Sequence, residues 1–357
     1  MDIKFIEIPQ NELKPKPPKD EVLGFGKIFT DYMFQMNYSP DKGWHDPVIK
    51  KLENFSLSPA VMVFHYSQEI FEGLKGYLRA DGKIGLFRSI ENFKRMNRSA
   101  ERMCMPTIPV EEQAYAIGEL LKIEKDWFPE KDRGSMYIRP TMIGTDPYLG
   151  VKESSEFIYY VILSPSGFYF KGGLKPVKVH VTDKYVRAAI GGVGFAKTGG
   201  NYAASLLAGK EAREKGCDQV LWLDAKHNKY VEEVGAMNIC FVLNDRTIVT
   251  SELDGAILEG VTRDSVLKLG KDLGYEIEER HISIDEVVEK IGSGEITECF
   301  GCGTAAVISP VGQLLYKDNW HSVSEEPGPV SQKLYEELTG IQWGIREDRY
   351  GWAKIVD

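Results

Sequence analysis

A glycine-rich stretch around one lysine constrains this chain more than any other feature of its sequence. Five glycines surround Lys197 between Gly191 and Gly200. Because glycine has no Cβ, such a stretch can turn tightly and lets a flat ligand approach the backbone closely. The Ala- and Leu-rich residues 201–213 that follow predict a helix. The stretch therefore predicts a rigid turn that carries a single amine and leads into a helix.

An amine held at the end of such a turn suits chemistry in which it must be neutral. It can form a Schiff base with a carbonyl compound or with pyridoxal phosphate. The alternative is a solvated lysine on a flexible surface loop, since glycine-rich loops are common. The loop alone does not distinguish these two interpretations. Other features of the sequence are needed to do so.

The composition limits the classes of protein that fit. A chain of 357 residues is too long for one small core, which predicts two domains. A hydrophobic content of 43% and a net charge of -9 are typical of a soluble protein that does not bind nucleic acid in general. No apolar run long enough to span a membrane and no signal-peptide pattern are present in the sequence, so we expect a cytoplasmic enzyme with no membrane partner.

The best candidate for a domain boundary is the stretch 164–176. It is rich in Gly, Pro and aromatic residues and breaks every hydrophobic periodicity. We therefore expect a small domain over 1–163, a linker over 164–176, and a larger domain over 177–357 that carries the lysine. Strand and helix patterns alternate in both halves, which predicts an α/β fold of the mixed α+β kind.

Four further features could complete a site for a phosphorylated aldehyde cofactor. Arg98, on a predicted helix, could hold a phosphate with its planar guanidinium. A helix start capped by Thr262 would offer free backbone N–H groups to an anion, and a tight turn ends at Thr304. Glu233, at the mouth of an apolar strand, could keep a pyridine nitrogen protonated. Each also has an ordinary explanation: a solvated arginine, a plain helix start, a plain turn or an exposed hairpin glutamate.

The order and spacing of these features resemble one family over nearly the whole chain. The matching stretches are Phe25–Asp31, Phe71–Lys75, Arg95–Ala100, Tyr137–Pro140, Gly191–Gly194, Gly199–Tyr202, Gln219–Trp222, Glu233–Asn238 and Phe300–Ala305. The sequence resembles a branched-chain amino acid aminotransferase, a pyridoxal-phosphate enzyme of fold type IV. The resemblance implies the two-domain architecture of that fold type, with a small and a large α/β domain.

The resemblance also implies roles for single residues. Lys197 matches the Schiff-base lysine, Arg98 the phosphate-binding arginine, and Tyr202 the tyrosine near the ring oxygen of the cofactor. Glu233 matches the carboxylate on the pyridine nitrogen. The remaining phosphate ligands match Val261, Thr262 and Thr304. The residues that form the substrate pocket in the family match Phe29, Tyr66, Tyr137, Arg139, Val151 and Ala305.

The activity implied is transamination between leucine, isoleucine or valine and 2-oxoglutarate, as used in branched-chain amino acid biosynthesis. The enzyme is expected to be a homodimer in which a loop of the neighbour, near 149–151, partly closes each pocket. No metal is expected. A D-amino-acid aminotransferase and an aminodeoxychorismate lyase of the same fold stay open as alternatives, as does a non-catalytic carrier of pyridoxal phosphate.

Two departures from the family pattern stand out. Many relatives have a threonine where this chain has Ala236. The Cys-x-x-Cys that mammalian members place after the Gly-Thr-Ala run is replaced by Ala306 and Ser309. A different pair, Cys299 and Cys302, comes earlier, and we expect two inert core thiols rather than a redox pair or half a metal site.

Overall fold

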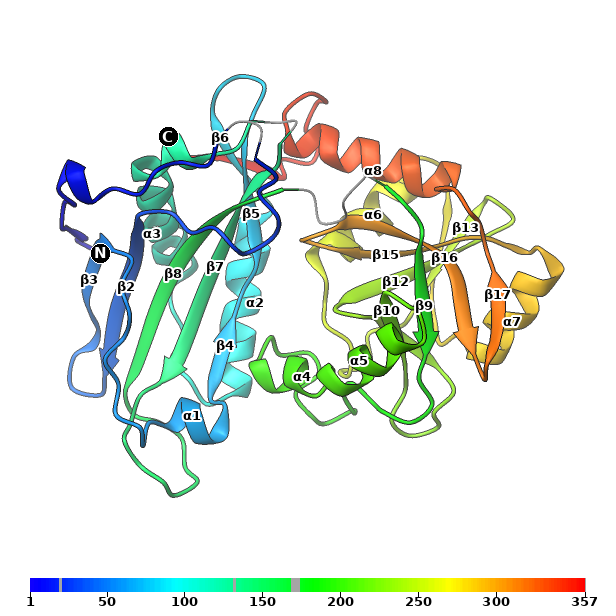
Figure 1. Ribbon diagram of the computed structural model, residues 1–357, viewed down its shortest axis with the longest axis horizontal. Helices are drawn as coiled ribbons and strands as arrows, with labels where there is room; N and C mark the ends of the chain where they lie inside the picture. The colour runs from blue at the N-terminus through cyan, green and yellow to red at the C-terminus, as the bar shows by residue number, and fades with distance from the viewer. Residues whose placement is uncertain (19–20, 131–132, 168–173, 357) are drawn as a thin grey trace. The chain divides into compact units, whose positions relative to one another are not determined.

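The computed structural model describes residues 1–18, 21–130, 133–167 and 174–356, and it divides into two compact units (Figure 1). The first comprises Met1–Tyr169, Ala196–Gly199 and Gly340–Asp357, and the second Phe170–Phe195 and Gly200–Thr339. Each unit combines a β-sheet with helices, so the expected mixed α/β class is confirmed. Within the described residues, no helix is both long and apolar enough to cross a membrane.

The first unit is built on a sheet that both ends of the chain complete. Its strands are β1 (Lys4–Phe5), β2 (Tyr32–Ser39), β3 (Gly43–Lys51), β4 (Glu69–Phe71), β5 (Leu74–Leu78), β6 (Ile84–Phe87), β7 (Ser135–Gly144), β8 (Phe157–Ser166) and β18 (Ala353–Val356). They pair in the order β1-β3-β2-β8-β7-β5-β6-β18, with β4 on β7. Its helices are α1 (Met62–Tyr66), α2 (Ser89–Arg102) and α3 (Val110–Ile123), and short 3-10 turns lie at η1 (Gln10–Glu12) and η2 (Lys125–Trp127).

Helices α2 and α3 cover one face of this sheet (Figure 1). The predicted helix that carries Arg98 is α2, and it buries Phe93, Met96 and Ala100 completely. Their spacing of three and four residues puts them on one helix face. They share a core with Phe34 of β2 and other strand residues, so burial of this apolar stripe fixes α2 against the sheet.

The second unit is built on a sheet that closes on itself. Its strands are β9 (Val177–Val181), β10 (Gln219–Leu223), β11 (Val231–Val234), β12 (Met237–Leu243), β13 (Thr247–Thr250), β14 (Glu276–Glu279), β15 (Ile296–Gly303), β16 (Val307–Tyr316) and β17 (Asn319–Ser322). They pair in the order β11-β10-β9-β16-β15-β12-β13-β14, with β17 on β16, and β11 also pairs with β12. That last pairing closes the strands from β11 to β12 into a ring. The helices α5 (Leu206–Glu214), α6 (Val261–Asp272) and α7 (Ile284–Ser293) contact its strands.

Two of the boundaries between the units lie inside helices, namely α4 (Gly199–Ala203) and α8 (Pro329–Gln342). The prediction for the region that follows Gly200 is wrong. The single helix predicted over 201–213 is instead split into α4 and α5, because the chain turns at Ala204 and Ser205. Ser205 donates its hydroxyl to the carbonyl of Tyr202 at 2.7 Å.

The division of the chain differs from the predicted scheme of 1–163, 164–176 and 177–357. Strand β8 continues through Ser166, so the chain is still in the first sheet where the linker was expected to begin. Residues 168–173 of that linker lie outside the described residues. The segment Ala196–Gly199 and the chain after Gly340 belong with the first unit by their contacts, although both were expected in the second. Pairing of β18 with β6 and the docking of Lys197 account for this difference.

Candidate active site

Both backbone polar groups of Lys197 are hydrogen-bonded within the first unit. Its N–H donates to Oγ of Ser99 at 2.9 Å, and its carbonyl accepts from the N–H of Phe71 at 3.0 Å. The hydroxyl of the next residue, Thr198, donates to the carbonyl of Glu69 at 2.8 Å. The segment is therefore held on α2 and on β4 at the same time, and the glycine-rich stretch carries its lysine on a fixed backbone.

The side chain of Lys197 lies over an aromatic ring. Its Nζ is 4.8 Å from the ring centroid of Phe71, within the range of a cation–π contact. The backbone here has no room for a larger residue after Thr198, because a Cβ on Gly199 would collide with Oε1 of Glu69. Glycine at this position is thus required by a close approach of the two segments.

A buried ion pair joins the helix of Ser99 to Glu72, which lies between β4 and β5. Arg95 binds Glu72 through two hydrogen bonds of 2.7 and 2.9 Å, and Asn92 donates to the same carboxylate at 3.0 Å. Both charged side chains are almost fully buried. Burial alone would raise the pKa of Glu72, but Arg95, and to a lesser degree Lys197, hold it below its ordinary value. Since Asn92, Arg95 and Ser99 follow one another at helical spacing, one face of α2 is directed to Glu72 and Lys197.

Arg98, the predicted phosphate ligand, is exposed on α2, whereas Arg95 is buried. Sequence reasoning passed over Arg95, although it lies one helical turn before Ser99 and therefore on the same face. A search for the arginine sharing a face with a buried polar residue would have found it.

Two predicted substrate residues are in direct contact on β7. Tyr137 and Arg139 alternate along the strand and so share a face. Nη2 of Arg139 donates to the hydroxyl of Tyr137 at 2.9 Å. The guanidinium also lies over the ring of Phe71, 4.7 Å from its centroid. Burial raises the pKa of the neighbouring Glu69, although Arg139 opposes that shift.

Three other predicted substrate residues are exposed in the first unit. The hydroxyl of Tyr66, at the end of α1, donates to the carbonyl of Leu149. Val151, two residues further along this loop, is 84% exposed, and Leu149 is 63% exposed. Phe29 lies in the segment before β2 and is also exposed. The loop 148–151 thus presents an apolar surface.

In the second unit, Glu233 on β11 is buried against an arginine. Oε2 of Glu233 is 3.1 Å from Nε of Arg187, and Oε1 accepts the N–H of Leu258 at 2.9 Å. Arg187 also donates to the carbonyl of Ala256. A buried carboxylate is costly unless it is paired in this way. Arg187 was not predicted, and its position 46 residues before Glu233 left no local signal.

Asn238 links Glu233 to the segment that leads to Val261 and Thr262, two of the predicted phosphate ligands. It faces Glu233 across the β11–β12 pair, and its Nδ2 donates to the carbonyl of Leu258 at 3.0 Å. A Cβ on Gly260 would collide with Oδ1 of Asn238, so the chain passes too close here for a side chain.

Helix α6 follows at once, beginning at Val261 with Gly260 as its N-cap. The prediction that Thr262 caps this helix is wrong, since Thr262 lies inside its first turn. No side chain caps the helix, and a helix start of this kind suits the binding of an anion. Thr304 and Ala305 lie in the turn between β15 and β16, and Cys302 just before them pairs with Asn238.

The two cysteines of the Cys-x-x-Cys spacing are buried on β15. Cys299 and Cys302 are 2% and 1% exposed, and each is a free thiol. Burial raises the pKa of Cys299, and a hydrogen bond with Cys240 followed by burial raises that of Cys302. The expectation of core thiols is confirmed.

Comparison with known proteins agrees with this geometry. Residues 69–314 match the family model described as amino-transferase class IV. A probable branched-chain-amino-acid aminotransferase of Staphylococcus aureus (strain N315) is 51% identical, with 98% of each chain covered. Branched-chain-amino-acid aminotransferase 2 of Bacillus subtilis (strain 168) is 50% identical, with 96% of this chain and 94% of that protein covered.

Solved structures agree as well. The branched-chain amino acid aminotransferase of Escherichia coli superposes with a TM-score of 0.76 at 28% identity, covering 92% of this chain and 99% of that one. The T.th. branched-chain amino acid aminotransferase complexed with N-(5'-phosphopyridoxyl)-L-glutamate gives a TM-score of 0.75 at 29% identity, covering 91% and 98%.

Proposed function

The chain belongs to the amino-transferase class IV family, and from this premise we propose that it transfers amino groups between branched-chain L-amino acids and 2-oxoglutarate. Its relatives at about half identity are named branched-chain-amino-acid aminotransferases or transaminases, so the D-amino-acid aminotransferase and aminodeoxychorismate lyase alternatives are not favoured. One observation in the structure carries the proposal. The amine of Lys197 and the guanidinium of Arg139 lie over the same ring, that of Phe71, at 4.8 and 4.7 Å.

The cofactor is pyridoxal phosphate, which supplies an electron sink for the amino acid when it is bound. The donor set fits this group: Lys197 would hold its aldehyde carbon, and Glu233, which is paired with Arg187, would hold its ring nitrogen protonated. The first N–H groups of α6, left without a side-chain cap, suit its phosphate. The full proposed set of cofactor residues is Arg98, Lys197, Tyr202, Glu233, Val261, Thr262 and Thr304.

We assign the proton transfer to the amine of Lys197, which would take the proton from the α-carbon of the amino acid and return it at the cofactor carbon. Hydrogen bonds at both its N–H and its carbonyl support this role, because only the side chain then has to move. Preorganised positioning of this kind lowers the barrier without any further contact to the substrate.

The same pocket has to accept an isobutyl group and a carboxylate. Arg139 and the hydroxyls of Tyr137 and Tyr66 would pair with the distal carboxylate of glutamate, and Phe29 would line the apolar side. The hydrogen bond of 2.9 Å between Arg139 and Tyr137 supports this arrangement. When leucine is bound, that bond keeps the guanidinium paired, so the arginine is not left buried without a partner.

We further propose a cytoplasmic homodimer. The exposed apolar side chains of Tyr148, Leu149 and Val151 support it, since such patches mark interaction surfaces. In the dimer this loop of one copy would partly close the pocket of the other, with Val151 touching the substrate; Ala305 completes the proposed set of substrate residues.

The test is a panel of initial rates with L- and D-amino acids and 2-oxoglutarate, using the cofactor-loaded enzyme. We expect turnover of L-leucine, L-isoleucine and L-valine, and only trace rates with D-alanine. Lys197→Ala serves as the control and should abolish turnover. Preference for D-amino acids, or release of pyruvate from aminodeoxychorismate, would assign the chain to one of the other class IV activities.

A further inference from the structure

The second unit contains a cavity of about 560 Å³ that the transaminase account does not use. It is lined by Asp224, His227, Tyr230, Glu232, Asp254 and His281, among others. Its volume falls within the range of small-molecule sites. Glu232 and Glu233 are consecutive on β11, so their side chains leave the strand on opposite faces. The cavity is therefore on the other side of β11 from the carboxylate assigned to the cofactor.

Glu232 is the buried polar group of this cavity. The residue is 3% exposed, and its Oε2 has no hydrogen-bond partner among the residues that the structure describes. A buried acceptor without a donor costs about 1–3 kcal/mol. Such an atom in the wall of a cavity of this size is placed to accept a hydrogen bond from a ligand.

The aromatic wall of the cavity is one tyrosine between two histidines. The ring centroid of Tyr230 is 5.8 Å from that of His227 and 5.2 Å from that of His281. The backbone behind it is firmly paired: Val231 donates to the carbonyl of Ile282 at 2.9 Å, and Ile284 donates to that of Lys229 at 2.9 Å. The wall is thus a preformed surface of three rings.

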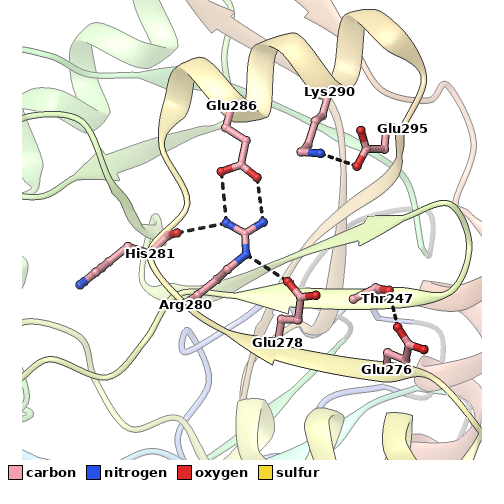
Figure 2. Close-up of polar contacts among 8 residues, drawn as sticks. All are labelled: Thr247, Glu276, Glu278, Arg280, His281, Glu286, Lys290 and Glu295. Atoms are coloured by element: carbon pink, nitrogen blue, oxygen red, sulfur yellow. Dashed lines mark hydrogen bonds and ion pairs between the residues drawn. The ribbon is translucent and has the colours of Figure 1, made fainter.

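Figure 2 shows how His281 is held. Its carbonyl accepts from Arg280 at 3.1 Å, while its imidazole points away from that arginine. Arg280 is itself fixed by Glu278 at 3.0 Å and by Glu286 of α7 at 2.7 and 3.1 Å. This cluster fixes the backbone of His281, and the imidazole of His281 lines the cavity.

Carboxylates outnumber cations around Glu232. Oxygens of Asp224 accept backbone N–H groups of residues 226, 227, 229 and 230, and Asp254 accepts that of Ala256 at 2.9 Å. Arg187, the cation that acts on Glu232, is paired with Glu233. A positive ligand is favoured by these charges and by the ring faces. Within the described residues, no three His, Cys, Asp or Glu side chains converge in a way that could hold a metal ion.

We propose that this cavity binds a small protonated amine, with its N–H donating to Oε2 of Glu232 and its alkyl groups against Tyr230 and the two imidazoles. The site lies on the other side of β11 from Glu233, and the proposal does not depend on the transaminase assignment.

Protonation of Glu232 should change when the amine binds. Burial raises its pKa to about 8, with Arg187 opposing and Asp254, Glu233 and Asp224 adding to the shift. The other titratable groups that line the cavity are Lys226, His227 and His281. At pH 7 the empty site therefore holds a protonated carboxyl, and a bound cation favours its ionised form. Binding at pH 7 should release about one proton, whereas binding at pH 9 should release almost none.

The probe is trimethylammonium chloride, titrated calorimetrically into the cofactor-loaded enzyme at pH 7 and pH 9 in buffers of different ionisation enthalpy. This amine has one N–H for the single unpaired oxygen, and it cannot condense with the cofactor aldehyde. Tetramethylammonium, which lacks that N–H, should bind at least about tenfold more weakly. We expect saturable binding of the first probe with release of about one proton at pH 7.

Variants separate the proposal from non-specific binding. Glu232→Gln should weaken trimethylammonium at least about tenfold and abolish proton release, while Glu276→Gln, at an exposed ion pair, should leave both unchanged. Should Glu232→Gln fail to fold, Tyr230→Leu should weaken binding about fivefold. No saturable heat, equal affinity for both probes, or parent-like affinity of Glu232→Gln or of Tyr230→Leu would overturn the proposal.

Discussion

The backbone N–H of Lys197 donates to Oγ of Ser99 at 2.9 Å, although 98 residues separate the two in sequence. Ser99 is completely buried on α2. The bond joins the glycine-rich stretch to the helix that also carries Arg95. We therefore propose that Ser99 is a positioning residue for the amine of Lys197.

Ser99→Ala should lower kcat at least about tenfold with a smaller change in KM, because the amide of Lys197 loses its partner and the amine its fixed position. Ser99→Thr keeps the hydroxyl and should restore most of the rate. The measurements are steady-state kinetics with leucine and the pH midpoint of the cofactor's visible absorbance change. Equal losses in both variants, with the midpoint unmoved, would leave Ser99 a purely structural role.

Two arginines of α2 should behave differently. If Arg98 holds the phosphate, Arg98→Met should weaken cofactor binding at least about tenfold while the melting temperature of the cofactor-free enzyme stays unchanged. Arg95→Met should lower that melting temperature, because it leaves the buried Glu72 without its cation, a loss of about 3–5 kcal/mol. Fluorescence titration with pyridoxal phosphate and thermal unfolding give both quantities. Weak cofactor binding in Arg95→Lys with parent-like binding in Arg98→Met would transfer the phosphate role to Arg95.

Glu233→Gln should leave the cofactor bound but slow the half-reaction with leucine by about 100-fold or more, since a neutral amide cannot hold the ring nitrogen protonated. Single-turnover absorbance measures this rate. Glu276→Gln, which removes an exposed carboxylate of the same unit (Figure 2), is the matched control and should react like the parent. An unchanged rate in Glu233→Gln would remove Glu233 from the cofactor site.

Arg139→Met should weaken glutamate and 2-oxoglutarate far more than leucine. Removing one partner of a buried charge pair costs roughly 2–5 kcal/mol, which is about 30-fold to several thousand-fold in affinity. Half-reactions with leucine and with glutamate, compared in parent and variant, measure the difference. Similar losses for both substrates would mean that Arg139 holds the α-carboxylate or the fold instead.

Glu232 should make the parent less stable as the pH rises. Its pKa in the folded enzyme is about 8 against an ordinary value of 4.5, so the unfolded chain releases this proton at lower pH than the folded one. Folding is therefore progressively disfavoured between pH 4.5 and pH 8. Glu232→Gln does not have this loss of stability. The melting temperature of the variant minus that of the parent should therefore increase by at least about 2 °C from pH 5 to pH 9. A gap that does not change with pH would contradict the shifted pKa.

Much of the fold and part of the site could be predicted because their signals are local. The apolar spacing along α2 and the alternation of Tyr137 and Arg139 on β7 each depend on neighbours a few residues away. The same holds for the strand at Glu233 and for the anion-binding start of α6, although the cap there is Gly260 rather than Thr262.

Other features of the site left no local trace. Arg187 pairs with Glu233 from 46 residues away, and nothing near either residue marks the other. The cavity at Glu232 arises because β11 closes the ring of strands and because Tyr230 pairs with Ser283. Such features depend on where distant segments meet, which one sequence without its fold does not reveal.

The sequence by itself determined that a lone lysine would lie in a glycine-rich turn before a helix, in a mixed α/β chain of the branched-chain aminotransferase type. Only the tertiary structure decided that Lys197 is held by Ser99 and Phe71 of the first unit, and that the chain after Gly340 returns to the first sheet. The physical reason is that a backbone hydrogen bond has no side-chain signature. Its partner is chosen by the packing of the whole chain, while propensity and periodicity act over single turns and strands.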